Sequence, residues 1–377
     1  MKRGLLFFCC LLPVLLAACG ETGQETARGP ADLIPSLTWQ APDDLDAAEA
    51  FTLTRSQEGY ILAEIPDDDA AWLVVPEGQP VPEDLPDTVT PLCQPLTDIY
   101  LAGSATMDML VKLDALDAVA YSALPADDWT IPEARNAMDR GDIVYAGKYS
   151  APDYERICGG HCGLAIENTM IYHSPEIREQ LERFGIPVLV DHASHEETPL
   201  GRMEWIKLYG ALLDREARAN AVYEAQAEVI RALREPDSRK TVAFFYLSSN
   251  GEVKVRRPDD YIPQLIRLAG GDYVFDHLEA ASALSTVTLQ WEEFYAAARD
   301  ADVLIYNSTV TEALPDLEAL AAKNPLLADF SAVQSGEVYC TKENFYQASM
   351  ELGDLASDLH AALTGDTDHL TYLDRLE

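Results

Sequence analysis

Two histidines and two glutamates stand within six residues, at His192-Ala-Ser-His195-Glu196-Glu197, the densest group of metal-ligand side chains in the chain. Imidazole nitrogens and carboxylate oxygens are the donors that zinc and related transition metals take. The spacing fixes no third ligand, and the two histidines fall on an expected loop. We therefore predict no metal site, and expect His192 and His195 to form a polar rim of a binding cleft.

A smaller group of such side chains is Cys158, His161 and Cys162. Its spacing is not that of a standard zinc finger, and no second cysteine pair follows it. A local disulfide or an inert glycine-rich loop is the expected structure.

The short motifs of phosphate-binding loops, dinucleotide folds, serine hydrolases and zinc proteases are all missing from the sequence. Without a nucleophile or a cofactor site, the chain is predicted to be a binding protein, not an enzyme, and to need no cofactor. A metal-dependent surface hydrolase built on His192, His195 and Glu196 is the alternative. A purely structural surface lipoprotein is a third reading.

The N-terminus has the pattern of a lipoprotein signal. Lys2 and Arg3 precede an apolar run, and Leu16-Ala17-Ala18-Cys19 follows it directly. The run is shorter than the roughly 20 residues that cross a bilayer. We predict cleavage before Cys19 and a lipid on its thiol, which would hold the protein on the extracytoplasmic face of the cell membrane.

The charge is strongly acidic. Removing residues 1–18 changes the formal net charge from −37 to −39, because Lys2 and Arg3 are lost. Such a chain repels phosphate backbones and anionic lipid headgroups. Nucleic acid is therefore excluded as a partner, and only the lipid is expected to contact the membrane. We expect a monomer.

Strands alternate with helices over most of the chain, which predicts an α/β fold with parallel sheets covered on both faces. We expect two Rossmann-like lobes joined by one long helix, and a small N-terminal β-hairpin extension. The expected divisions are a signal at 1–18, a tether and linker at 19–49, the hairpins at 50–91, lobes at 92–213 and 236–377, and the joining helix at 214–235. The apolar stripe of that helix is expected at Ala217, Ala221, Val222, Ala225, Val229 and Leu233.

Several ordered motifs resemble one family, the substrate-binding lipoproteins of ABC importers for iron–siderophore complexes, haem and vitamin B12. The resemblance covers most of residues 95–365 and rests on the strand and turn at 97–106, Gly147 to Glu155, Gly185-Ile186-Pro187-Val188, Leu268-Ala269-Gly270-Gly271 and Ala332 to Tyr339. The chain departs from the family pattern at 158–164, and the hairpins at 50–75 are not part of it.

The resemblance implies that the protein captures an iron chelate, with a siderophore or haem, or a corrinoid between its lobes. It also implies delivery of that ligand to an ABC permease dimer. In this family one glutamate on each lobe seats in the permease, and the matching positions here are Glu155 and Glu293, each seven residues before a comparable point of its lobe.

Ligands of open α/β sheets bind beyond the carboxyl ends of the strands. Aromatic rings there can stack on a flat ligand, and arginines can pair with its acidic groups. The candidate ligand-binding residues are Ser104, Tyr149, Asn168, Thr169, His192, His195, Arg202, Tyr246, Ser248, Arg256, Arg257 and Tyr306. For the tyrosines and Arg257 the alternative is a half-buried packing role and a solvated surface charge.

Arg202 stands in the first turn of an expected helix, with Thr198 as its N-cap and Pro199 at its first position. It is either a ligand anchor or an ion-pair partner of Glu204 or Glu197.

Overall fold

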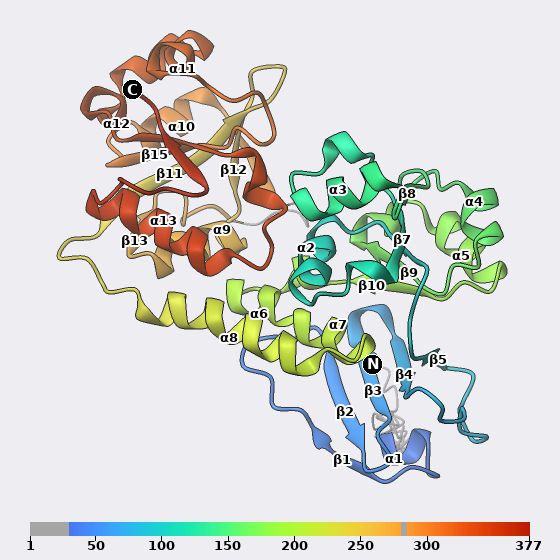
Figure 1. Ribbon diagram of the computed structural model, residues 1–377. Helices are drawn as coiled ribbons and strands as arrows, with labels where there is room; N and C mark the ends of the chain where they lie inside the picture. Colours follow the sequence, from blue (N-terminus) through green and yellow to red (C-terminus); the bar gives the residue numbers. More distant parts are fainter. Residues whose placement is uncertain (1–29, 280–284) are drawn as a thin grey trace, which may run out of the picture.

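The computed structural model describes residues 30–279 and 285–377, so Cys19 and its signal lie outside the described residues. Two α/β lobes stand side by side, with the long helix α8 (Glu216–Ala232) beneath them and a separate small sheet below the first lobe (Figure 1). The predicted α/β fold with two lobes is confirmed. None of the helices in the described ranges is both long and apolar enough to span a bilayer.

The small sheet is the N-terminal extension, defined here as residues 39–93. It has the strand order β1-β2-β3-β4-β5, antiparallel except for the parallel pair β4 and β5. Its elements are β1 (Trp39–Pro42), β2 (Thr52–Ser56), β3 (Ile61–Ile65), the short helix η1 (Pro66–Asp68), β4 (Ala70–Val75) and β5 (Val89–Cys93), preceded by α1 (Pro30–Leu33). The expected hairpins are therefore part of a larger sheet, and β1 lies within the stretch expected as tether and linker.

Lobe 1 contains a fully parallel sheet of order β10-β9-β6-β7-β8. Its strands are short apolar runs because helices cover both faces. They are β6 (Ile99–Leu101), β7 (Val119–Ser122), β8 (Val144–Tyr145), β9 (Ala165–Asn168) and β10 (Val188–Asp191). The helices of lobe 1 are α2 (Ser104–Lys112), η2 (Leu116–Ala118), η3 (Ala126–Asp128), α3 (Pro132–Arg140), α4 (Tyr154–Gly159), η4 (Thr169–His173), α5 (Pro175–Arg183), η5 (Ala193–His195), α6 (Pro199–Glu204) and α7 (Ile206–Leu212).

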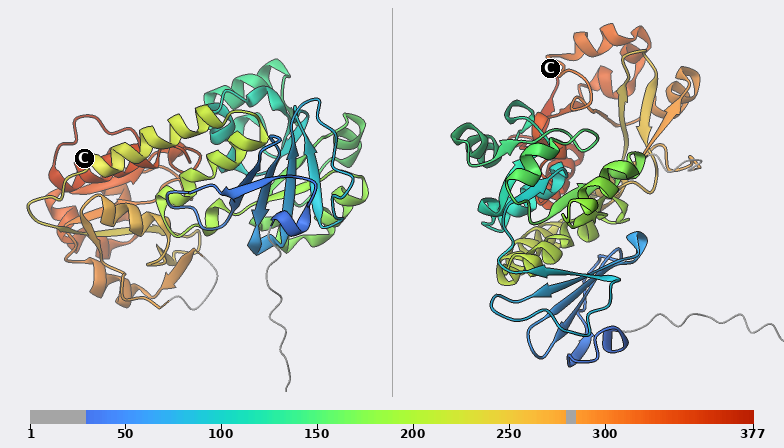
Figure 2. Two further views of the ribbon diagram at one scale, coloured as in Figure 1. Left: turned by 90° about the horizontal axis from the view of Figure 1, so that it is seen from below. Right: turned by 90° about the vertical axis from the view of Figure 1, so that its right-hand side faces the viewer.

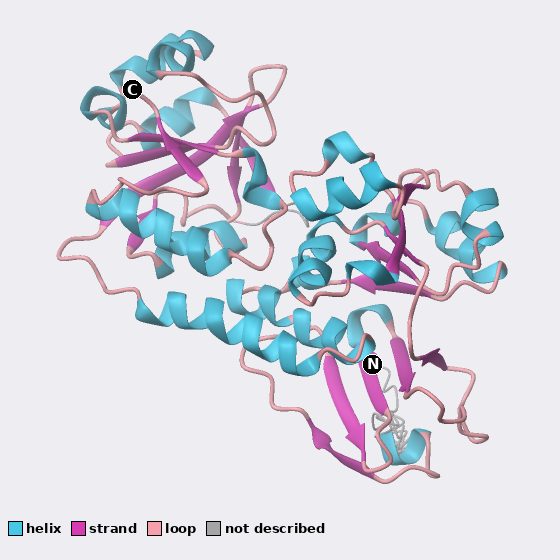
Figure 3. Ribbon diagram, in the orientation of Figure 1, coloured by secondary structure: helices cyan, strands magenta, loops and turns pink. Residues whose placement is uncertain are grey.

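Lobe 2 has a mixed sheet of order β14-β12-β11-β15-β16-β17, with β13 also paired to β11. Strands β11, β13, β15 and β16 are parallel, while the pairs β11–β12, β12–β14 and β16–β17 are antiparallel. The strands are β11 (Lys240–Leu247), β12 (Val253–Arg256), β13 (Gly271–Tyr273), β14 (Thr286–Leu289), β15 (Val303–Tyr306), β16 (Val338–Thr341) and β17 (Leu373–Arg375). The helices are α9 (Tyr261–Leu268), α10 (Trp291–Ala298), α11 (Leu317–Lys323), η6 (Pro325–Asp329), α12 (Ser331–Ser335), η7 (Glu343–Tyr346) and α13 (Leu352–Thr364). In both lobes the helices flank the strands, whereas the extension is nearly all strand (Figure 3).

Helix α8 buries a different face from the one predicted. The buried residues are Ala219, Tyr223, Ala227 and Ile230, and the expected stripe of alanines and valines is exposed or only half buried. Tyr223 decides the orientation, because its ring lies under the ammonium of Lys207 and its hydroxyl donates to Asp46. A large aromatic residue contributes more on burial than an alanine does.

Two buried carboxylates of lobe 1 hold the extension in place. Glu204 accepts the backbone N–H groups of residues 46, 47 and 48, and Glu196 accepts those of residues 49 and 50. Glu204 is fully buried and also pairs with Lys207 at 2.6 Å. In both views of Figure 2 the extension lies beside lobe 1 and away from the C-terminus, which is in lobe 2. The extension is thus a fixed part of lobe 1.

Candidate functional site at the contact between the lobes

The lobes touch where Arg202 of α6 meets Tyr261, the first residue of α9. The guanidinium carbon lies 4.1 Å from the centroid of the tyrosine ring, and Nη2 donates to the carbonyl oxygen of Ser194 at 2.7 Å. Thr198 and Pro199 start α6 as predicted, and Thr198 accepts the N–H of Gly201. Arg202 pairs with neither expected glutamate, because Glu204 is committed to the extension and Lys207.

Arg256, at the end of β12, approaches the same tyrosine from lobe 2. Its Nη2 donates to the hydroxyl of Tyr346 at 2.7 Å, and Asn307 donates to that hydroxyl at 2.7 Å as well. Asp260 lies 3.7 Å from Nε and is the nearby counter-charge. The Arg256 side chain is only 11% exposed, so it is held rigidly within this wall.

Both arginines are incompletely satisfied. The Nε of Arg202 and the Nε of Arg256 are buried, and neither has a hydrogen-bond partner among the described residues. Burial lowers the pKa of Arg202, with the charge of Arg256 acting in the same direction. Two neighbouring guanidiniums, each with a buried Nε that lacks a hydrogen-bond partner, form a cationic centre, a local group of cationic donors, even though the carboxylates of Asp260 and Asp191 act on Arg202. An acidic group of a ligand is the partner that such a centre accepts.

A second contact joins the lobes near the start of α13. Gln347 accepts the N–H and hydroxyl of Thr130, and the N–H of Met350 donates to the buried Asp108 at 2.8 Å. Lys112 pairs with Glu351 beside them. Together with the stack of Arg202 on Tyr261, these bonds join the two lobes.

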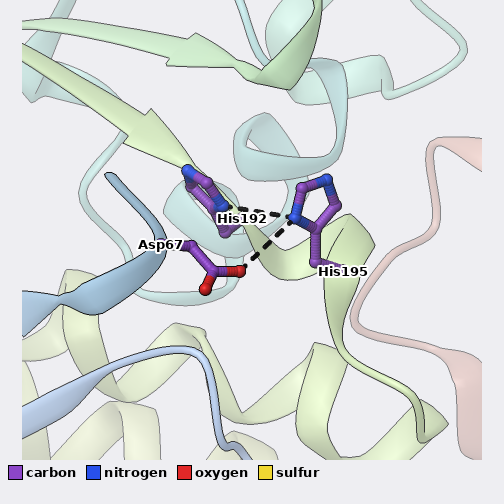
Figure 4. A group of neighbouring side chains, drawn as sticks. All are labelled: Asp67, His192 and His195. Atoms are coloured by element: carbon purple, nitrogen blue, oxygen red, sulfur yellow. Dashed lines mark hydrogen bonds and ion pairs between the residues drawn. The ribbon is translucent and has the colours of Figure 1, made fainter. Parts of the chain in front are cut away.

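His192 and His195 face each other at the edge of lobe 1, beside the tip of the extension. Their Nδ1 atoms are 3.3 Å apart, and Asp67 of η1 places a carboxylate oxygen 3.8 Å from Nδ1 of His195 (Figure 4). His192 is buried, whereas the His195 side chain is 48% exposed. Burial lowers the pKa of His192, and the neighbouring His195 adds to this effect. A residue of the extension therefore lies beside the two histidines that were expected at the rim of a cleft.

The other candidates of lobe 1 lie near the carboxyl ends of its strands. Ser104 begins α2, and Thr169 begins η4 directly after β9. Asn168 caps η4 by accepting the N–H of Met170. Tyr149 is half buried and packs on the lobe 1 core, as in the packing role given above as the alternative to ligand binding.

The remaining candidates of lobe 2 are separate from Arg256. Tyr306 is fully buried, and Tyr246 is half buried against the core. Ser248 stabilises the turn between β11 and β12 through Asn250, at the end of β12 opposite Arg256. Arg257 pairs with Asp259. Of the candidates, the structure brings Arg202 and Arg256 together around Tyr261, and His192 and His195 together at the edge of lobe 1.

Sequence reasoning missed Tyr261 and Tyr346 in this wall, whereas Asn307 lies in the stretch from Tyr306 to Ser308 that was expected at the cleft. Asn307 directly follows β15, and Tyr346 follows β16, so the ends of those strands were the available signal. It also missed Asp67, whose signal was a run of three aspartates in an expected turn. Cys158 and Cys162 are free thiols, so the disulfide considered for them is absent and the glycine-rich loop is what the structure has.

Glu155 lies in the first turn of α4 and Glu293 in the first turn of α10, both exposed and on different lobes (Figure 1). Asp153 caps α4 by accepting the N–H of Arg156.

A family model described as periplasmic binding protein matches residues 100–345, which is more than half of the chain. The chain belongs to this family. The matched range runs from β6 of lobe 1 to η7 of lobe 2 and excludes the extension. The periplasmic binding proteins bind solutes outside the cytoplasmic membrane, in agreement with the absence of known catalytic motifs.

Three relatives illustrate the similarity. An uncharacterized lipoprotein of Methanocaldococcus jannaschii is 24% identical over 312 residues, 77% of this chain and 72% of the relative. A periplasmic haem-binding protein of Vibrio cholerae has a TM-score of 0.57 at 20% identity, covering 70% of this chain and 99% of that one. A petrobactin-binding protein of Bacillus subtilis has a TM-score of 0.57 at 12% identity, covering 71% and 92%. At these identities the solved structures establish a shared fold.

Proposed function

We propose that this periplasmic binding protein is a lipid-anchored receptor that captures an iron chelate or a corrinoid between its lobes and delivers it to an ABC permease. The two buried guanidiniums at Tyr261 carry the proposal, because each has a donor atom without an acceptor. Leaving a buried donor unpaired costs about 1–3 kcal/mol. A ligand with acidic groups recovers this free energy.

The buried ring of Tyr261, with Arg202 over its face, and the hydroxyl of Tyr346 lie in the same wall as the cationic centre. Haem and anionic ferric siderophores carry acidic groups that can pair with such a cationic centre, so we favour these ligands over a corrinoid. The similar proteins of V. cholerae and B. subtilis are haem-binding and petrobactin-binding proteins, which supports the same class of ligand.

The acidic surface does not oppose an anionic ligand at close range. Charges more than about 8–10 Å away are largely screened at physiological salt. Arg202 and Arg256 act within hydrogen-bond distance, where their local charge outweighs the distant carboxylates.

A binding titration of the full chain tests this function. Tryptophan fluorescence is followed while ferric siderophores that carry carboxylates, haem and cobalamin are added, and the recovered ligand is weighed by mass spectrometry. We expect saturable binding of an anionic chelate, with its mass unchanged. Arg256→Gln should weaken binding about 10–100-fold, because a charged hydrogen bond is worth about 1.5–3 kcal/mol.

The control is Arg239→Gln, which removes a charge paired with Asp272 outside the wall and should leave the affinity unchanged. No saturable binding by any compound, together with metal-dependent hydrolysis of ester substrates, would replace the proposal by the surface hydrolase.

A further inference from the structure

Three possible metal ligands from two parts of the chain meet beside η5. His192 and His195 come from lobe 1, and Asp67 comes from the turn between β3 and β4 of the extension. One ligand atom of each lies within 4.8 Å of the other two. Figure 4 shows the two imidazoles and the carboxylate directed toward one another. The sequence-based prediction of no metal site rested on a missing third ligand, which the extension supplies.

The distances suit a small divalent cation. Two nitrogens that each lie about 2.0–2.1 Å from a tetrahedral zinc are about 3.3 Å apart. The two Nδ1 atoms are 3.3 Å apart, and the Asp67 oxygen is 3.8 Å from His195 Nδ1. The three ligand atoms lie within 4.8 Å of one another, so the exposed Asp67 must move closer to the imidazoles to complete the geometry.

Hydrogen bonds on the Nε2 side of the His192 ring determine which of its two nitrogens is free to bind a metal. The hydroxyl of Tyr172 donates to Asp68 Oδ1 at 2.7 Å, since an ionised carboxylate only accepts. The same hydroxyl lies 2.7 Å from His192 Nε2, so Nε2 must carry the proton and donate it to the tyrosine oxygen. The lone pair of His192 is therefore on Nδ1, facing His195. Partners of this kind orient metal-binding histidines.

Asp68 is itself held in position. It accepts from Nη1 of Arg178 at 2.6 Å, and its side chain is only 3% exposed. Adjacent aspartates of one turn thus have different roles, with Asp68 orienting Tyr172 and Asp67 facing the imidazoles. Glu196, the residue after His195, anchors the extension through the N–H groups of residues 49 and 50. The same loop therefore carries an imidazole and fixes the segment that brings Asp67.

We propose that Asp67, His192 and His195 bind a divalent first-row transition metal, with Zn²⁺ as its representative, at the junction of the extension and lobe 1. Two nitrogens and one oxygen are donors that these cations accept. The side chains of Asp67 and His195 are 63% and 48% exposed, which leaves a coordination position open to water or to a small donor ligand. This site needs no chelate in the cleft and does not depend on the proposed function.

The test uses the full chain, purified in detergent without an affinity tag and stripped with EDTA. Calorimetric titration with ZnCl₂ should give one site, and CoCl₂ should give the visible absorption of a tetrahedral cobalt centre without a thiolate charge-transfer band. His195→Ala and Asp67→Ala should each weaken zinc binding at least about tenfold. Tyr172→Phe should weaken it by a smaller factor, because both metal ligands of lobe 1 remain.

Glu197→Ala is the matched control, since it removes a neighbouring exposed carboxylate outside the cluster, and its zinc affinity should equal that of the wild type. Thermal melts without metal show whether each variant is folded, and added zinc should raise the melting temperature of the wild type but not of His195→Ala. The proposal is wrong if folded His195→Ala and Asp67→Ala bind zinc as the wild type does. It is also wrong if cobalt gives a thiolate band, which would assign the metal to the free cysteines.

Discussion

Arg202 of lobe 1 lies over the ring of Tyr261 of lobe 2, and this stack ties the two lobes together across the candidate site. A cation–π contact of this kind contributes about 0.5–2 kcal/mol. We expect a double-mutant cycle with Arg202→Ala and Tyr261→Leu, followed by urea unfolding, to return a coupling free energy in that range. Tyr261→Phe keeps the ring and should retain most of it. A coupling of zero would mean that the stack does not hold the lobes.

Glu204→Gln should destabilise the protein by about 3 kcal/mol, because a fully buried carboxylate loses its charge while three backbone donors and Lys207 still face it. The midpoint of urea unfolding measures the change. Glu197→Gln alters an exposed glutamate of the same region and should shift stability by less than about 0.5 kcal/mol. Equal effects of the two substitutions would contradict the anchoring role of Glu204.

Because of Glu167, we expect the free energy of unfolding to fall as the pH rises. It is fully buried in β9, both oxygens lack partners among the described residues, and burial raises its pKa to about 8. The unfolded chain releases this proton near pH 4.5, whereas the folded chain keeps it to about pH 8. The contribution of this group therefore falls by about 1.4 kcal/mol per pH unit in between.

Glu167→Gln should match the wild type near pH 5 and be more stable near pH 8, by on the order of 2–4 kcal/mol. Unfolding midpoints at the two pH values measure this. A constant difference between the two proteins would show that Glu167 is ionised in the fold.

Charge reversal of Glu155 and Glu293 to arginine should abolish uptake of the chelate by cells and leave the affinity of the purified protein unchanged. Complementary charges across an interface mainly set encounter and register. Glu133 of α3 and Glu318 of α11 are exposed first-turn glutamates of the same two lobes, so their double reversal is the matched control. Normal uptake by the Glu155→Arg, Glu293→Arg protein would remove these residues from docking.

Cys19→Ser should release the protein from the membrane fraction, because the lipid is its proposed anchor. Fractionation after a high-salt wash measures this. A variant that still sediments with membranes must be held by another contact.

The alternation of apolar runs and amphipathic segments was enough to predict the two lobes, since burial on both faces of a parallel sheet leaves a strong local pattern. Local chemistry also located the start of α6, where Thr198 and Pro199 have the residue types of a cap and a first turn. Arg202 could therefore be proposed from the sequence. Its partner Tyr261 could not, because that contact depends on how two separately folded lobes are placed.

The extension and the buried face of α8 were predicted less well than the lobes. Strand β5 contains Pro91, which is tolerated because β5 is an edge strand, yet it obscures the strand pattern. In α8 the face was misassigned because the packing of Tyr223 depends on Asp46 and Lys207, which are distant in sequence. Asp67 is near His195 for a similar reason, since long-range hydrogen bonds from Tyr172 and Arg178 to Asp68 position its turn.

The anchoring of the extension has a consequence for the order in which the chain is made and exported. The N–H groups of residues 46–50 emerge first, yet their acceptors Glu204 and Glu196 follow 146–158 residues later. Until those carboxylates arrive, five backbone donors of the extension have only water as a partner. Docking of the extension therefore waits for a later part of the chain, and a chain stalled during translocation before residue 196 would leave the extension undocked.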